Sequence, residues 1–470
     1  MITIQEAARI LEKKISSVKG DFTLNDAASL TGLPVDQARE VLDTLMGRYV
    51  CRLQVTENGD LLYGFGTPLK RRGEKTFQEK MDAFGEWLWK AFTVFFKAWI
   101  TITLVVYFVL FVVILIAAII AMSQGKDRKS NVNLGIVGDL FYAMFRWNTV
   151  NRTISYTNDM HGYRYRQYDA KKGSLNEKKK SFIASVYDFV FGPPRVEIDP
   201  LNNEKEVAAY VRKSKGIVTP TELVALAGWT MEDAERFLSD CVVRFKGEVR
   251  ISDNGMVYGR FDELQRSAGD IEVGKIEWFW DEYEPEYKLT DNTSGRNALI
   301  VFLNGFNLFM ATLLTAGFLN ASGTVPSDRV VVIFLGWLPL VFSAIFFAVP
   351  IARWFKIQGL RRKRMQTNIR KRIMRVLFKR AEKSFSLDTL LSEVNNQGVE
   401  KKLTKADLEG ELKNMMVDYR GEMILNDDGA VLYRFELFEE HEKEAARIRR
   451  QVSKGDTTLG EVIYDSASLK

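Results

Sequence analysis

Residues 204–261 read EKEVAAYVRKSKGIVTPTELVALAGWTMEDAERFLSDCVVRFKGEVRISDNGMVYGRF, and this stretch decides the fold. Apolar residues recur at helical spacing in its first three pieces. Thr219-Pro220 marks a helix start, because a threonine side chain caps the free N–H groups of a first turn. The last piece runs through Asn254-Gly255, a pair that favours the tight turn of a β-hairpin. The stretch therefore predicts three helices followed by a hairpin.

The same pattern occurs three times along the chain. The other hairpin turns are Asn58-Gly59 and Asp428-Gly429. Such a repeat indicates one structural unit used three times. We name these units module 1 (residues 1–66), module 2 (200–262) and module 3 (368–437).

Three helices followed by a hairpin resemble the winged-helix fold, over roughly 60 residues per copy. That family includes DNA readers, but tandem winged helices also serve as protein-binding scaffolds, as in the ESCRT-II complex. Residues 187–223 are also similar to stretches of uncharacterised bacterial and plastid membrane proteins. The resemblance implies an α+β protein with a membrane context and supplies no activity.

Long apolar runs predict three transmembrane helices. Residues 98–122 carry no charge, and about 20 such residues cross the hydrocarbon core. We expect this span, with an amphipathic lead-in, within 85–124; the absence of Gly and Pro from 87 to 123 favours a straight helix. Two further runs, 298–319 and 330–352, predict a transmembrane helical hairpin over 298–352.

Orientation follows from the Lys and Arg residues of 351–380, which contain no acidic residue among them. This cluster predicts that modules 2 and 3 face the cytoplasm, in a bacterial inner membrane. Basic residues flank the first span on both sides, at 70–75 and 126–129. Either module 1 is translocated or the first segment enters and leaves the same face, so the sequence leaves the side of module 1 open.

The segments between these units receive more general predictions. Residues 134–190 are expected to form an interfacial helix, at 134–147, and a basic, aromatic linker. Residues 353–367 form a basic juxtamembrane segment that leads into module 3. We expect it to contact anionic headgroups or to act as a topology signal, through Arg353, Lys356, Arg361, Arg362, Lys363 and Arg364. The tail at 438–470 receives no assignment.

The third helix of each module argues against DNA binding. A helix that enters the major groove needs basic residues to neutralise phosphates, yet each third helix carries more acidic than basic residues. The formal net charge of +6 comes from the basic cluster after the last span. We therefore expect the third helices to form a protein-interaction surface through Asp36, Glu40, Glu232, Glu235, Asp407 and Glu411.

Few residues suit catalysis. The chain has two His and two Cys, far apart in the sequence, and no nucleotide-binding or hydrolase motif. We predict no catalytic residue, metal site or cofactor. Asn304 and Asn307 lie three residues apart in a predicted span, where their amides are expected to hydrogen-bond a neighbouring helix or subunit.

These features favour a non-enzymatic integral membrane scaffold that uses tandem winged-helix modules for protein–protein interaction and self-assembly into a homo-oligomer. Its protein partner is unknown. The alternative is a membrane-anchored DNA-binding regulator. A third interpretation is a homo-oligomeric channel or lipid transporter.

Overall fold

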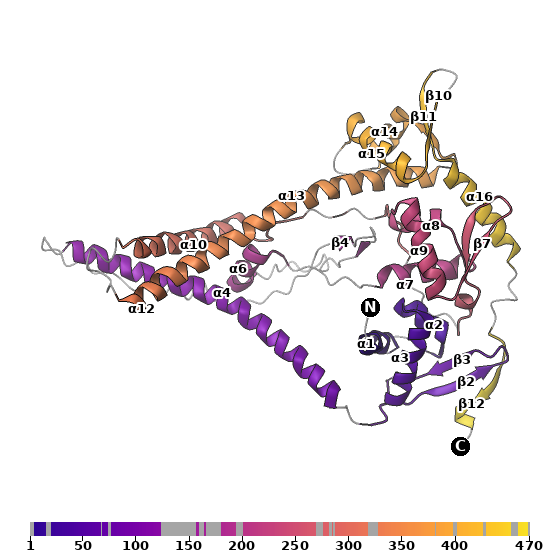
Figure 1. Ribbon diagram of the computed structural model, residues 1–470, viewed down its shortest axis with the longest axis horizontal. Helices are drawn as coiled ribbons and strands as arrows, with labels where there is room; N and C mark the ends of the chain where they lie inside the picture. The colour runs from indigo at the N-terminus through magenta and orange to yellow at the C-terminus, as the bar shows by residue number, and fades with distance from the viewer. Residues whose placement is uncertain are drawn as a thin grey trace.

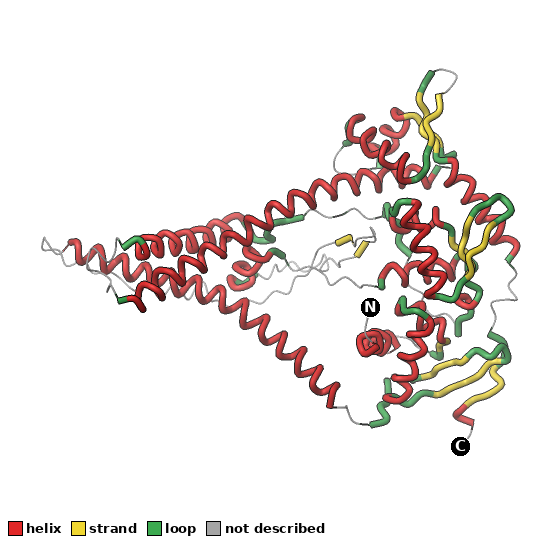
Figure 2. Tube along the Cα trace, in the orientation of Figure 1, coloured by secondary structure: helices red, strands yellow, loops and turns green. Residues whose placement is uncertain are grey.

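The fold is seen in a computed structural model that describes residues 4–15, 20–66, 68–73, 77–123, 157–158, 164–165, 180–193, 201–268, 276–281, 284, 287–317, 328–380, 382–397, 402–425, 429–452 and 459–468. Helices predominate, and the strands form small antiparallel sheets. Figures 1 and 2 show an elongated molecule in which long helices meet in a bundle at one end and the three modules lie at the other. At this level the expected mixture of helices and hairpins is confirmed.

The three modules have the same order of elements. Module 1 contains α1 (Ile4–Ile15), β1 (Phe22–Thr23), α2 (Leu24–Thr31), α3 (Val35–Arg48), β2 (Arg52–Thr56) and β3 (Leu61–Gly64). Module 2 contains α7 (Asn202–Lys213), β6 (Ile217–Val218), α8 (Pro220–Ala227), α9 (Met231–Arg244), β7 (Glu248–Ile251) and β8 (Val257–Arg260). Module 3 contains the end of α13 (Leu338–Lys379), β9 (Ser384–Ser386), α14 (Leu387–Asn395), α15 (Lys405–Asp418), β10 (Glu422–Leu425) and β11 (Val431–Arg434).

Local chemistry explains why these elements begin and turn where they do. The side chain of Thr23 accepts a hydrogen bond from the N–H of Asp26 at 3.1 Å, and that of Thr219 accepts one from Glu222 at 3.3 Å. Each hairpin turn contains a glycine with positive φ, which costs a glycine little. In every module the short first strand pairs with the second strand of the hairpin. The first strand of the hairpin (β2, β7 or β10) therefore lies on the far side of the hairpin from that short strand.

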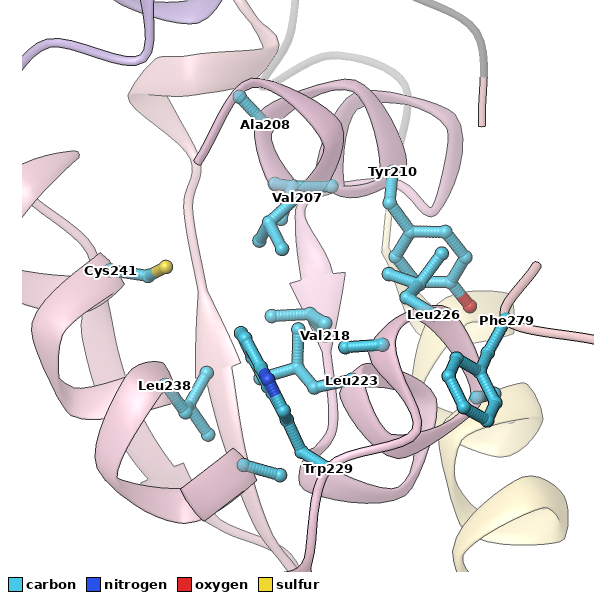
Figure 3. Close-up of a cluster of buried hydrophobic side chains, with 14 of the residues drawn as sticks. Val207, Ala208, Tyr210, Val218, Leu223, Leu226, Trp229, Leu238, Cys241 and Phe279 are labelled. Carbon is cyan, nitrogen blue, oxygen red and sulfur yellow. The ribbon is translucent and has the colours of Figure 1, made fainter. Parts of the chain in front are cut away.

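The core of module 2 shows how one module is packed. Figure 3 shows Leu238 and Cys241 of α9 facing Val207 of α7, with Trp229 between the helices. The ring of Phe279, which follows the module in the chain, covers the end of α8. A Cβ on Gly228, where φ is +71°, would lie 2.5 Å from that ring. The linker after module 2 is therefore part of the packed structure.

Within the described residues, three helices are long and apolar enough to cross a membrane. They are α4 (Phe77–Ser123), α10 (Ser294–Thr315) and the run formed by α12 (Arg329–Val331), the π-helix η2 (Val332–Trp337) and α13. α4 is unbroken over 47 residues and begins earlier than the predicted segment at 85. Near its middle it contacts α6 (Phe182–Phe191) through Phe96 and Phe191, whose rings are tilted at 49° to one another.

The predicted boundaries after the last span require correction. α13 continues through Pro350 as one helix of 42 residues, so residues 353–367 are no separate segment but the middle of this helix. Its final turns are the first helix of module 3, where Ile373 and Leu377 are buried. The interfacial helix predicted at 134–147 lies outside the described residues. Of the linker that follows, β4 (Thr157–Asn158) pairs with β5 (Arg164–Tyr165).

The C-terminal residues, which the sequence left without an assignment, form regular structure. α16 (Glu436–Gln451) follows module 3, and β12 (Val462–Asp465) with the short helix η4 (Ser466–Ser468) ends the described chain. β12 pairs with β2 of module 1, so the last strand extends the first sheet to the order β1-β3-β2-β12. We call α16, β12 and η4 together the C-terminal strap. Figure 1 shows α16 beside module 2 and β12 beside module 1.

Candidate functional site in the module assembly

Modules 1 and 2 are joined through a buried ion pair between Asp26 and Arg212. The guanidinium of Arg212 lies 2.5 Å from Oδ1 of Asp26, and both side chains are almost fully buried. Oδ2 of Asp26 accepts hydrogen bonds from the backbone N–H of Thr23 at 2.8 Å and of Ala268 at 3.1 Å. One carboxylate therefore caps α2 and binds the neighbouring module. Nothing in the sequence indicated the contact with Arg212.

Backbone carbonyls complete this interface. Asn25 donates to the carbonyl of Glu263 at 2.9 Å, and Arg244 donates to the carbonyl of Gly32 at 3.0 Å. Gly32 closes α2 with φ of +72°, and a Cβ there would lie 2.8 Å from the carbonyl oxygen of Leu201. The two modules approach so closely at this point that only glycine fits.

The linker after module 2 and a surface ion pair join module 2 to module 3. Trp280 stacks on Phe378 with ring centroids 4.9 Å apart, and the ammonium of Lys371 lies 4.9 Å above the ring of Phe279. Glu235 of α9 pairs with Arg420, which follows α15, at 3.0 Å. All three modules thus form one continuous assembly.

The C-terminal strap fastens this assembly. Arg449 of α16 donates to the carbonyl of Ile217 at 3.0 Å, and Arg447 pairs with Asp253 at 2.8 Å. His441 lies on the same helix, where burial lowers the pKa of its imidazole. The negative charge of Glu235 opposes this shift, and the positive charge of Arg420 adds to it. At the far end, the pKa of Asp465 is held well below its usual range, chiefly by hydrogen bonding from Arg52.

The predicted acidic surface is only partly a free surface. Asp36 pairs with Lys246 of module 2 at 2.7 Å, and Glu235 pairs with Arg420 as described. Asp407 caps α15 by accepting from Thr404, and Glu232 pairs with Arg236 on its own helix. Glu40 is exposed.

Glu411 was wrongly placed on that surface. It is 6% exposed and lies 2.5 Å from Arg370, which also pairs with Asp418 at 2.7 Å. The face of α15 that carries Glu411 packs against α13, whose basic residues continue into module 3. The acidic count in the sequence cannot separate such a buried pair from a solvated charge.

The six basic residues predicted to contact headgroups divide into two groups. Arg353 donates to the carbonyl of Leu289 at 2.9 Å, Arg361 to Tyr287 at 3.1 Å and Arg364 to Glu284 at 2.7 Å. These three therefore hold the chain that leads to α10 against α13. Lys356, Arg362 and Lys363 are exposed.

Asn304 and Asn307 lie fully buried between the apolar helices. The amide of Asn304 donates to the carbonyl of Ser343 on α13 at 3.1 Å, and that of Asn307 donates to Leu104 on α4 at 2.9 Å. The two neighbouring amides thus bind α10 to both other long helices. Their spacing in the sequence placed them on one face of α10, but it could not identify these partners.

Among the described residues, no group of three His, Cys, Asp or Glu side chains is arranged to hold a metal ion. Cys51 and Cys241 are free thiols. Burial raises the pKa of Cys51 to about 11. The polar groups of the assembly bind one another, which suits a structural role.

Comparison with curated proteins finds a distant relative, an uncharacterised chloroplastic protein of Arabidopsis thaliana. The two chains are 25% identical over 360 residues, which covers 72% of this chain and 66% of the plant protein. The chain thus spans about two thirds of that relative's length. No protein-family model and no solved structure matches the chain.

Proposed function

We propose that this protein is a non-enzymatic integral membrane scaffold whose three modules are winged-helix domains. The order helix, strand, helix, helix, hairpin in each module, with the short first strand paired to the hairpin's second strand, supports the winged-helix interpretation. The single observation that carries the proposal is the joining of the modules. A buried ion pair, ring contacts and the strap hold them as one body at the end of the apolar helices.

The assembly also supports a topology. Because module 1 is bound to module 2, the proposal places both modules on the same side of the membrane. The exposed Lys356, Arg362 and Lys363 support the cytoplasmic face of a bacterial inner membrane as that side. Cysteine replacements at the exposed Asp43 and Ser239 test this: a membrane-impermeant maleimide should label neither in intact spheroplasts and both after permeabilisation. Labelling at residue 43 alone would refute a common side.

The use of the charged and polar groups favours a scaffold over the other candidates. Asp36 and Glu235 on the third helices pair with basic residues of neighbouring modules, which supports contact between modules as the role of this acidic surface. Asn304 and Asn307 give their amide hydrogens to helix backbones, which supports helix packing. Self-assembly into a homo-oligomer remains part of the proposal.

Crosslinking in cells, followed by purification in a gentle detergent and mass spectrometry, tests the scaffold function. We expect a second protein in fixed proportion, crosslinked to modules. A pure homo-oligomer whose crosslinks lie only between its long helices would instead indicate a channel or transporter. Binding of duplex DNA with a steep salt dependence would indicate the regulator.

A further inference from the structure

The first strand of the hairpin occupies the same position in all three modules but differs between them in what covers it and in its charge. β2, β7 and β10 are the outer strands of hairpins that occupy equivalent positions in modules 1, 2 and 3. β2 is covered by β12, whereas β7 and β10 are the last strands of their sheets. An uncovered strand presents free N–H and C=O groups, so proteins commonly protect it with charge or use it for binding.

The covered strand shows what this edge accepts. β12 runs antiparallel to β2, with Tyr464 opposite Val55 and Asp465 opposite Gln54. The charge of Asp465 is matched by Arg52, whose Nε lies 3.0 Å from Oδ1 of the carboxylate. An extended segment with apolar residues and one matched charge therefore binds the outer strand of module 1.

The repeat permits a position-by-position comparison of the three edges. Counting back from the turn glycines Gly59, Gly255 and Gly429, the residues equivalent to Arg52 are Glu248 and Glu422. The residues equivalent to Gln54 are Arg250 and Ile424. The charge that binds Asp465 in module 1 is thus reversed in the other two modules.

β7 protects its edge with its own charges. Arg250 pairs with Glu248 at 2.7 Å, both on the same strand. A partner strand would have to displace this pair, and charged side chains on an edge strand discourage pairing. Module 2 is therefore a poor site for strand addition.

β10 has no such protection. Met423, Ile424 and Leu425 are 62%, 36% and 72% exposed, a run of three apolar side chains on an outer strand. Within the described part of the chain, Glu422 forms no ion pair. Figure 1 shows the β10–β11 hairpin pointing away from modules 1 and 2. The assembly therefore leaves this strand accessible.

We propose that β10 is a docking edge that binds an extended segment of a partner protein by β-strand addition. The segment carries apolar residues along Met423 and Leu425 and a Lys or Arg where β12 carries Asp465, so that it faces Glu422. The like charges of Asp465 and Glu422 would oppose binding of β12 from a second copy. This inference rests on the proposed scaffold function and names the chemistry of its partner.

A peptide assay on the full chain in detergent tests the edge directly. The probe is a fluorescent peptide of residues 459–468 with Asp465→Lys and a photoreactive group in place of Ile463. We expect it to bind and to crosslink within residues 422–425, about fivefold more tightly than the peptide with the native Asp465. Glu422→Arg should reverse this preference.

Matched variants come from the repeat itself. Ile424→Arg gives β10 the arginine of β7 and should abolish binding, whereas Arg250→Ile should create binding at β7. Neither position is buried, so both variants are expected to fold, as circular dichroism can verify. If the peptide crosslinks to the same extent in the Ile424→Arg and Glu422→Arg variants as in the native chain, the inference is overturned.

A second copy of the chain is the competing occupant. Concentration-dependent association that Ile424→Arg abolishes, with β10-to-β10 crosslinks and no peptide binding, would overturn the inference in its favour. The peptide assay uses no cellular partner. A failure of peptide binding would therefore overturn the docking edge at β10 without contradicting the scaffold function. A failure to co-purify a cellular protein would contradict the scaffold function without deciding whether β10 binds the peptide.

Discussion

Arg52 and Asp465 lie 413 positions apart in the sequence, yet Nε of the arginine is 3.0 Å from one carboxylate oxygen of the aspartate and 3.1 Å from the other. This pair joins the first hairpin of the chain to its last strand. Module 1 is therefore held from two sides, by module 2 through Asp26 and by the C-terminal strap through Asp465. The order of the modules along the chain does not predict that the C-terminal strap binds module 1.

Asp465→Asn should loosen the strap at module 1. The substitution keeps the size of the side chain but removes the charge that binds Arg52. We expect faster amide hydrogen exchange in residues 462–465, measured by mass spectrometry. The pKa of Asp465 is lowered in the folded protein, so its ionised form stabilises the fold. This stabilisation is complete at any pH above the ordinary pKa of an aspartate and is lost as the pH falls through the lowered pKa, in strongly acidic solution. Asp253→Asn removes the module 2 partner of Arg447 in α16; it is the matched control and should leave exchange in β12 unchanged.

Arg212→Met should separate modules 1 and 2. It leaves the carboxylate of Asp26 buried without its cation, and breaking one partner of a buried pair costs about 3–5 kcal/mol. We expect the free energy of unfolding of module 1 to fall by that amount, as measured by denaturant titration. The control is Arg236→Met, which removes an exposed pair with Glu232 and should change stability by less than about 1 kcal/mol. Equal effects of both substitutions would contradict the buried contact.

The assembly should be less stable in mildly acidic solution because of His441. Burial lowers the pKa of this imidazole, so folding favours the neutral form. Its contribution is complete above the ordinary value of 6.5 and is lost as the pH falls through the lowered value. Melting temperatures between pH 5 and 8 check this, and His441→Gln should remove the part of the pH dependence that belongs to this residue. An unchanged profile in the variant would exclude His441 as its source.

Both thiols should resist alkylation in the folded protein. Burial raises the pKa of Cys51 to about 11 and raises the pKa of the buried Cys241 further. Since the thiolate is the reactive form, maleimide at neutral pH should label neither at an appreciable rate until denaturant is added. Ser239→Cys, on the exposed side of α9, is the positive control. Rapid labelling of Cys241 in the native chain would show that the core of module 2 opens readily.

Asn307→Leu should weaken the helix bundle by about 1 kcal/mol, the usual value of a hydrogen bond between apolar helices. The amide would no longer bind the carbonyl of Leu104, so α10 would separate more easily from α4. Thermal unfolding in detergent measures this. Thr312→Val is the control, because the hydroxyl of Thr312 bonds only the backbone of its own helix at Leu308. Ion or lipid flux that depends on Asn307 would instead support a conduction role.

Much of the fold could be predicted from the sequence because its signals are local. A charge-free run predicts the apolar part of α4, and the pair Thr219-Pro220 predicts the start of α8. The turns at Gly59 and Gly255 follow from the same reasoning. The boundary at residue 353 was wrong because helical periodicity continues through it. A helix can serve a membrane and a soluble module without any break in its local pattern.

The contacts of the candidate site were harder to predict from the sequence, because nothing in the local sequence distinguishes their residues from ordinary surface residues. Asp26 resembles any capping residue, Glu411 any acidic helix residue, and VIYD at 462–465 any short tail. Their roles depend on partners hundreds of positions away in some cases, and no local propensity encodes such a partner. The same limit applies to Arg353, which looks like a topology signal but binds the carbonyl of Leu289.

Composition and spacing within a few turns of chain were enough to predict the three modules and the apolar helices, and to show that familiar catalytic motifs are absent from the sequence. Which charges are buried, that β12 completes the first sheet, and that, in the described chain, β10 is the one equivalent edge both uncovered and uncharged along its apolar run, depend on the folded structure. Burial and strand pairing are properties of surfaces brought together from distant segments. Those surfaces exist only once the chain has folded.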